Sequence, residues 1–181
     1  WINNLVNSGL IPSEKRPLVH VMMGGNVQDN WKLKPETDTI IIGTQDQLLS
    51  RALNRGYSVS RFMWPVHFAL LNNDSLWVMD EVQLMGSGLA TTAQLEAFRR
   101  DFGTFLPTKS IWMSATYSIG WLNTVDFRKY ASSCKEVTLS ERDRAHTGIN
   151  QRLTAYKPVH RIDAIPGDLK TIAEKVVALH R

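Results

Sequence analysis

Four short apolar runs, each rich in β-branched or aromatic residues, constrain the fold of this chain more than any other feature. They occupy residues 17–23, 39–44, 75–81 and 109–116. Each run is continuous in its apolar character rather than alternating with polar residues. That pattern predicts strands covered on both faces, as in a parallel sheet.

Helical periodicity follows three of these runs, at 44–56, 90–103 and 119–131. In the first of these segments the apolar residues fall on one stripe, and Gly56 is suited to cap the end of the helix. Alternation of strands with helices predicts a parallel sheet with helices on both faces. The predicted fold class is therefore α/β.

The last quarter of the chain has a different character, because charged and turn-forming residues become frequent there. This pattern predicts a connector over residues 133–167, with short β-like stretches only at 136–139 and 152–156. An amphipathic helix is predicted at 168–181, with Asp168 as its N-cap.

Composition excludes several classes of protein. The 181 residues include one cysteine, Cys134, which rules out an internal disulfide framework and agrees with a cytoplasmic location. The sequence has no secretory signal at its start, and no run approaches the roughly 18 apolar residues of a membrane span. It opens on Trp1 rather than methionine, and we expect a piece of a longer polypeptide.

The net charge of +4 is compatible with nucleic-acid binding without requiring it. The arginines form loose groups, among them Arg51, Arg55 and Arg61, and then Arg142, Arg144 and Arg152. Each group is either a solvated face or a contact surface, and the sequence leaves both interpretations open. The segment Trp64, Pro65, His67 and Phe68 could stack on bases, but its apolar neighbours favour packing in the core or between domains.

Two adjacent carboxylates, Asp80 and Glu81, come at the end of the third apolar run. Ligands of parallel α/β sheets bind beyond the carboxyl ends of the strands. There, one carboxylate can hold Mg²⁺ through its waters while the next orients the water that attacks a γ-phosphate. The simpler alternative is that Asp80 caps the following turn and Glu81 is solvated.

The fourth run ends in the hydroxyl residues Ser114 and Thr116, with Ala115 between them. If the third and fourth strands are neighbours, these hydroxyls can bond the amide of Gln83, which has both a donor and an acceptor. "DEVQ" and "SAT", each ending a buried strand, are together far more specific than either alone. They match motifs II and III of superfamily 2 helicases.

With "IIGTQDQLLSRALNRGY" and "WPVHFALLNNDSLWVMDEVQLMG" added, the sequence closely resembles the CRISPR-associated helicase–nuclease of type I interference systems, in particular the subtype first labelled U and later G. The resemblance extends from about residue 17 to the end. It implies two RecA-like domains that clamp ATP and ratchet along single-stranded DNA, recruited by an RNA-guided surveillance complex. Residues 1–132 would be part of the first domain, 133–167 the interdomain linker and 168–181 the first helix of the second.

The resemblance also implies roles for single residues. Asp80 would bind Mg²⁺, and Glu81 would activate water. Ser114, Ala115 and Thr116 would form the motif that couples the nucleotide state to DNA. Gln83 stands where many relatives carry His, a departure expected to change this coupling more than hydrolysis itself.

Two further segments resemble DNA-contacting motifs of that family. Gly43, Thr44 and Gln45 would hold the DNA backbone, through the hydroxyl, the amide and the free N–H groups of a helix start. The alternative, which does not exclude the first, is that Thr44 simply N-caps its helix. Gly24 and Gly25 would let a DNA strand approach closely, although a plain turn is the simpler interpretation.

No G-x-x-x-x-G-K-[ST] phosphate loop occurs in the 181 residues, nor do the nuclease motifs of the family. We therefore expect this chain alone to hydrolyse ATP poorly or not at all. Two alternatives to a DNA motor stay open: a non-catalytic RecA-like docking fragment, and a superfamily 2 RNA helicase.

Overall fold

The computed structural model divides the chain into two compact units, Trp1–Cys134 and Lys135–Arg181, which are described separately here. It describes residues 1–23, 26–27, 30–116, 118–157, 161 and 167–179. The division lies two residues beyond the boundary predicted from composition. Among the described residues, no helix is long and apolar enough to span a membrane.

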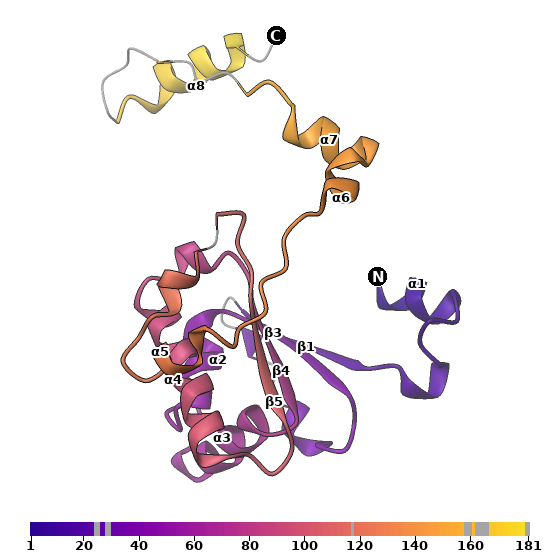
Figure 1. The fold of residues 1–181 in the computed structure, drawn as a ribbon, viewed down its shortest axis with the longest axis vertical. Helices are drawn as coiled ribbons and strands as arrows, with labels where there is room; N and C mark the ends of the chain where they lie inside the picture. The colour runs from indigo at the N-terminus through magenta and orange to yellow at the C-terminus, as the bar shows by residue number, and fades with distance from the viewer. Residues whose placement is uncertain (24–25, 28–29, 117, 158–160, 162–166, 180–181) are drawn as a thin grey trace. The chain divides into compact units, whose positions relative to one another are not determined.

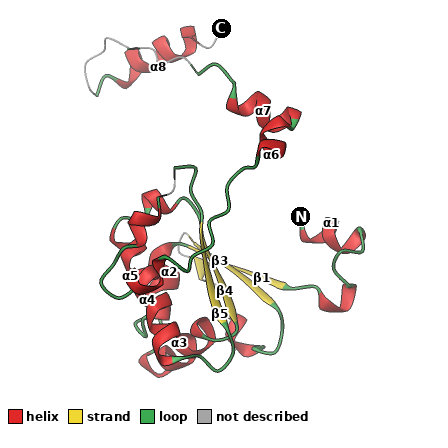
Figure 2. Cartoon of the chain, viewed as in Figure 1, coloured by secondary structure: helices red, strands yellow, loops and turns green. Residues whose placement is uncertain are grey.

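The four predicted strands are all present in the first unit (Figures 1 and 2). They are β1 (Leu18–Met23), β3 (Thr39–Gly43), β4 (Ser75–Met79) and β5 (Thr108–Trp112). A short β2 (Asn26–Val27) pairs antiparallel with β1, whose other edge pairs in parallel with β3. Strands β4 and β5 form a separate parallel pair. The α/β class is thus confirmed.

The principal helices of this unit are α2 (Gln45–Ala52), α3 (Trp64–Asn72) and α4 (Ser87–Phe102), preceded in the chain by a short α1 (Ile2–Asn7). The predicted helices at 44–56 and 90–103 are confirmed as α2 and α4, with shifted ends. Helix α3 is not predicted by periodicity, because "WPVHFALLN" is apolar around most of its circumference and has no single stripe.

The expectation that the strands are covered on both faces is wrong for the described residues. Burial alternates along β3, β4 and β5, so that every second side chain is exposed. The exposed apolar residues of these three strands are Ile40, Ile42, Leu76, Val78 and Ile111. Helices α2, α3 and α4 lie to one side of the strands (Figure 1). A continuous apolar run shows that both faces of a strand are apolar, but not that both are packed.

The single helix predicted at 119–131 is also wrong. The structure has a 3₁₀ turn, η5 (Ile119–Leu122), and a separate short helix, α5 (Arg128–Ala131). Between them, the hydroxyl of Thr124 accepts a hydrogen bond from the backbone N–H of Phe127 at 3.3 Å. A threonine that bonds the backbone in this way favours a new helix start over continuation.

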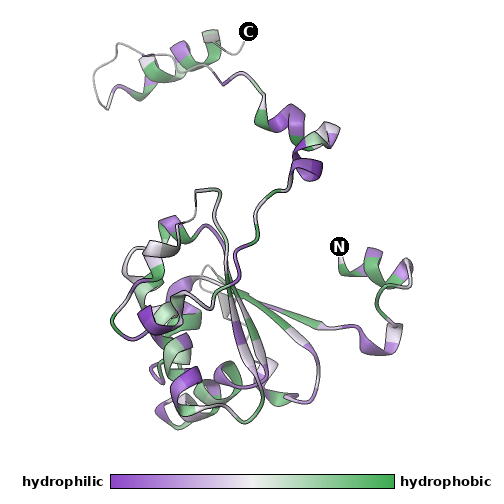
Figure 3. Ribbon diagram, in the orientation of Figure 1, coloured by the Kyte–Doolittle hydropathy of each residue, from purple (hydrophilic) through white to green (hydrophobic). Residues whose placement is uncertain are grey.

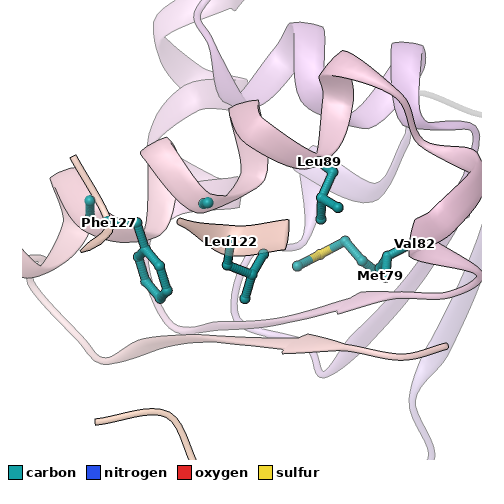
Figure 4. Packing of buried hydrophobic residues seen from close by; sticks show 7 residues of the cluster. Met79, Val82, Leu89, Leu122 and Phe127 are labelled. Carbon is teal, nitrogen blue, oxygen red and sulfur yellow. The ribbon is translucent and has the colours of Figure 1, made fainter. Parts of the chain in front are cut away.

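Two clusters of buried side chains form the core of the first unit. One cluster joins β4, α4 and the segment around η5, and it comprises Met79, Val82, Leu89, Ala93, Ala97, Leu122 and Phe127. Figure 4 shows Leu89 and Leu122 approaching the end of β4 at Met79. The other cluster comprises Met22, Trp31, Leu49, Ala52, Leu71 and Leu95. Trp77 and Met85 pack against both clusters, so the two are continuous.

A buried polar network lies beneath α4. The guanidinium of Arg99 donates from Nε to Asn72 Oδ1 at 2.8 Å, and Asn72 in turn donates to the carbonyl of Ala52 at 3.1 Å. The same guanidinium lies 5.2 Å from the ring of Trp77. Burial lowers the pKa of Arg99 to about 10, and the charge of Glu96 opposes this shift. The network therefore connects α2, α3, β4 and α4.

The second unit contains α6 (Glu141–Ala145) and α7 (Thr147–Leu153), whose residues are largely hydrophilic (Figure 3). The β-like stretches predicted at 136–139 and 152–156 are wrong, because the first has no regular structure and the second begins inside α7. Short β-like stretches are not stable as strands without a partner strand, so hydrogen bonds that cap the helices determine the local structure here.

The capping residue of α6 is Ser140, which forms a reciprocal capping box with Asp143. Hydrogen bonds from Ser140 lower the pKa of Asp143. The predicted C-terminal helix is confirmed as α8 (Leu169–Leu179). Its predicted cap is confirmed as well, because Asp168 Oδ1 accepts the backbone N–H of Thr171 at 3.2 Å.

Candidate functional site

The candidate site lies where β4 and β5 end. The two strands pair in parallel with Met79 opposite Trp112, so their carboxyl ends share one edge. Pairing continues past the strands: the N–H of Met113 donates to the carbonyl of Met79 at 2.9 Å, and the N–H of Val82 donates to the carbonyl of Met113 at 3.1 Å. The predicted adjacency of the two strand ends is confirmed.

The carboxylate doublet occupies the turn that follows β4, and both side chains are exposed. Asp80 Oδ1 accepts the backbone N–H of Glu81 at 2.9 Å, so the carboxylate of Asp80 does bond this turn. Glu81 has φ 48° and ψ 49°, a left-handed conformation that costs a residue other than glycine about 1 kcal/mol or more. The surrounding chain, anchored by buried Val82, holds the turn in this conformation.

A relay of hydrogen bonds joins the two strand ends through Gln83. Ser114 Oγ donates to Gln83 Oε1 at 2.6 Å, and Gln83 Nε2 donates to Glu81 Oε2 at 2.5 Å. The predicted hydroxyl-to-amide bond is therefore present with Ser114. Thr116 takes part through its backbone N–H, which donates to Ser114 Oγ at 3.1 Å. Ala115 lies between them in an exposed turn.

The relay fixes the direction of the Glu81 side chain. The amide of Gln83 uses its acceptor toward Ser114 and its donor toward Glu81, so it cannot flip without losing both bonds. Glu81 Oε2 accepts one hydrogen bond, and a carboxylate has about four acceptor positions in all. The exposed carboxylate can thus bind and orient a water molecule while the relay holds it in place.

The segment Gly43–Gln45 ends β3 and begins α2. Thr44 Oγ1 accepts the N–H of Gln47 at 3.4 Å, so the capping interpretation is confirmed. A side chain at Gly43 would approach Leu48 to 3.1 Å and Met22 to 3.3 Å, which is why a glycine suits this tight turn. Whether these residues also contact DNA stays a prediction, and Gly24 and Gly25 lie outside the described residues.

A contact that the sequence does not reveal joins this segment to the start of α4. A Cβ built on Gly88, in the first turn of α4, would lie 2.6 Å from Gln45 Oε1. The amide of Gln45 therefore lies directly against the backbone at the start of α4, a few residues after Glu81. Only the small size of Gly88 permits this approach. A glycine at a helix start, as in "MGSGLA", is the one sequence signal that could have indicated it.

Packing accounts for part of the segment at 64–68. His67 is fully buried, and its ring lies 5.1 Å from that of Trp31. Trp64 is half-buried and donates from Nε1 to the carbonyl of Val59 at 3.1 Å. Phe68 is 43% exposed, so it is not enclosed in the core of the unit.

Three comparisons with known proteins were made. No family model matches the chain, and neither a curated protein nor a solved structure matches it. In the part of the chain that the structure describes, no group of three or more His, Cys, Asp or Glu side chains is placed to hold a metal ion.

Proposed function

We propose that this chain carries the hydrolysis and coupling motifs of a superfamily 2 helicase, a cytoplasmic ATP-driven motor that moves along single-stranded DNA in type I CRISPR interference. One observation supports this most strongly: the relay from Ser114 through Gln83 to Glu81, at the shared edge of β4 and β5. A solvated doublet would not require a polar residue of the neighbouring strand end to hold its second carboxylate.

In this proposal the two carboxylates have different roles. Mg²⁺ in nucleotide sites is held by one or two carboxylates together with waters and phosphate oxygens, and the exposed pair at 80–81 fits that ligand set. The bound ion would neutralise the charge that develops on the transferred phosphate. Asp80 would hold it, and Glu81 would orient the attacking water.

The relay also supplies a route for coupling. A displacement of the β5 tip moves Ser114, and the amide of Gln83 passes this to the carboxylate of Glu81. We propose that DNA bound near Thr44 and Gln45 acts on the same site, because Gln45 lies against Gly88 at the start of α4. Nucleotide would then act at Glu81 and DNA at Gly88, which lie in the same stretch of chain from the end of β4 to the start of α4.

The proposal assigns the first unit to part of a RecA-like domain, and the second to the linker and the start of another such domain. A motor of this kind needs a phosphate loop, which none of the 181 residues supplies. We therefore propose that other residues of the same polypeptide supply it, and that an RNA-guided surveillance complex delivers the DNA.

The test is DNA-stimulated ATP hydrolysis by the complete polypeptide that contains this chain. Asp80→Asn should abolish hydrolysis and largely spare DNA binding. Glu81→Gln should slow hydrolysis about 100-fold or more, the usual effect of losing a group that activates water. Asp38→Asn, a change of the same kind on an exposed loop, should leave the rate unchanged.

Hydrolysis at a near wild-type rate by the Asp80→Asn variant would overturn the assignment of the metal carboxylate. Stimulation by RNA equal to that by DNA would favour the RNA helicase. A complete polypeptide that neither binds nor hydrolyses ATP would favour the docking fragment.

A further inference from the structure

An open hollow of about 870 Å³ lies in the segment that connects α2 to α3, away from the residues assigned above. Its lining comes from residues 55–61 and from Trp64. From the sequence alone, the arginines of this stretch could form either a solvated face or a contact surface.

The structure separates the three arginines of this region. Arg51 is fully buried, whereas Arg55 and Arg61 are exposed at the hollow. Within the described part of the chain, neither exposed guanidinium pairs with a carboxylate, and no acidic residue lines the hollow. Tyr57, which is 61% exposed, presents an aromatic ring in the same stretch.

Hydrogen bonds from the side chains of Arg51 and Trp64 hold the backbone of the loop that lines the hollow. The guanidinium of Arg51 donates to the carbonyl of Gln47 at 2.8 Å and to that of Tyr57 at 3.4 Å. On the other side, Trp64 Nε1 donates to the carbonyl of Val59 at 3.1 Å. A loop that is already ordered loses less entropy when a ligand binds, so these partly buried hydrogen bonds favour recognition at the hollow.

The packing inside the loop leaves little freedom as well. A Cβ at Gly56 would approach Arg51 Cγ to 3.1 Å and Val59 to 3.2 Å, so the side chains of Arg51 and Val59 would have to shift to admit a larger residue. Ser58 has φ 53°, which directs the chain back toward α3. The two arginines and the tyrosine are therefore presented by a shaped loop rather than by a simple surface strand.

We propose that this hollow binds single-stranded nucleic acid, with Arg55 and Arg61 on phosphates and the ring of Tyr57 on a base. A single strand offers negatively charged phosphates and flat bases in turn. Arginines can bind the phosphates, and an exposed aromatic ring can stack on a base. The hydroxyls of Ser58 and Ser60 can donate further hydrogen bonds to phosphate oxygens. The site is separate from the Gly43–Gln45 segment and requires no ATP hydrolysis.

The experiment is fluorescence anisotropy of the complete polypeptide that contains this chain with labelled single-stranded oligothymidylate, oligouridylate and a duplex, without nucleotide. Arg55→Ala/Arg61→Ala should weaken binding of the single strands about tenfold or more, because two charge-assisted contacts are lost. The slope of log K against log salt should fall in magnitude by about 1.4, or about 0.7 for each phosphate contact. Arg16→Ala/Arg128→Ala removes the same charge from exposed positions elsewhere and should change both quantities little.

The ring is tested separately. Tyr57→Ala should weaken binding about fivefold or more, whereas Tyr57→Phe keeps the stacking surface and should bind as the wild type does. All these side chains are exposed, and thermal unfolding measured by circular dichroism should confirm that the variants fold.

The inference is overturned if the wild type does not bind single strands at low salt, or if both double variants weaken binding equally. It is also overturned if the duplex binds more tightly than the single strands and Tyr57→Ala has no effect. A preference for DNA over RNA, or the reverse, identifies the natural strand and supports the site in either case. The difference between Arg55→Ala/Arg61→Ala and the matched double variant decides this inference, whereas ATP hydrolysis by Asp80→Asn and Glu81→Gln decides the proposed function, so each can fail without the other.

Discussion

Two hydrogen-bonded networks begin in very different surroundings, one at Ser110 within β5 and the other at Ser114 just beyond its end. In the buried network, Ser110 Oγ donates to Glu96 Oε2 at 2.8 Å, and Glu96 lies within 3.9 Å of Arg99. In the exposed network, Ser114 begins the relay that ends at Glu81. The buried network connects secondary-structure elements, whereas the exposed one positions a single carboxylate.

The difference matters because burial decides what a polar contact contributes. Removing one partner of a buried charged network leaves other polar groups without water, which is strongly destabilising. An exposed hydrogen bond can be replaced by water at little loss of free energy. We therefore expect the relay to contribute little to the stability of the fold, and the left-handed backbone of Glu81 is itself unfavourable. Such a combination is typical of a site kept for function.

The largest effect is expected where the buried network is broken. Arg99→Ala removes the donor to Asn72 Oδ1 and the charge beside Glu96, both of which are buried. We expect the free energy of unfolding to fall by about 3–5 kcal/mol, measured by urea denaturation. That is a large part of the roughly 5–15 kcal/mol that a domain has.

Arg100→Ala is the matched control, since this arginine also bonds Glu96, at 2.8 Å, but its side chain is 35% exposed. We expect a loss of only about 1 kcal/mol. Equal losses for Arg99→Ala and Arg100→Ala would contradict the view that burial decides the effect.

A smaller effect on stability, combined with a larger one on activity, is expected for the relay. Ser114→Ala removes the hydroxyl that donates to Gln83, and the free energy of unfolding should change by about 1 kcal/mol or less. In the complete polypeptide, DNA stimulation of ATP hydrolysis should fall, because Glu81 is no longer linked to β5. Ser118→Ala alters an exposed serine nearby and should affect neither quantity. Unchanged DNA stimulation in Ser114→Ala would show that the relay does not couple.

Much of the candidate site could be predicted from the sequence, because its residues lie at the ends of two recognisable strands. An apolar run that stops at Asp80 and another that stops at Ser114 define two strand ends, and parallel pairing follows from the alternation with helices. The Gln83–Ser114 contact then depends on adjacency alone. The box of Ser140 and Asp143 was also readable, since Ser-x-x-Asp is a local capping pattern, but the β-like residues around it obscured the signal.

The remainder depends on distant partners. Arg99 and Asn72 lie far apart in sequence, and an arginine in a helix normally indicates a solvated face. Likewise, nothing in "SRALNRGYSVSR" separates the buried Arg51 from the exposed Arg55 and Arg61. The uncovered faces of β3, β4 and β5 could not be inferred either, because an apolar strand has the same composition whether or not a second layer packs on it.

The smallest effect is expected from a third network, which joins α4 to α5 and is reached by solvent, with the side chain of Lys129 57% exposed and that of Asp101 30% exposed. Asp101 accepts hydrogen bonds from Lys129, at 2.6 Å, and from the hydroxyl of Tyr130. The bond from Lys129, followed by that from Tyr130, lowers the pKa of Asp101 below its ordinary value of 3.8. Because the pKa is lower in the folded state, the contribution to stability is present above 3.8 and is lost as pH falls through the folded pKa.

Asp101→Asn should therefore lower the midpoint of thermal unfolding slightly near neutral pH, and the gap from the wild type should close in strong acid, where the wild-type carboxyl is protonated. High salt should narrow the gap at neutral pH as well, since solvent and ions screen exposed pairs. Asp38→Asn changes a carboxylate for which no described hydrogen bond or ion pair is found, and it should show no such dependence. If Asp101→Asn lowered the midpoint of thermal unfolding at neutral pH as much as Arg99→Ala does, burial would not distinguish the effects of the two networks on stability.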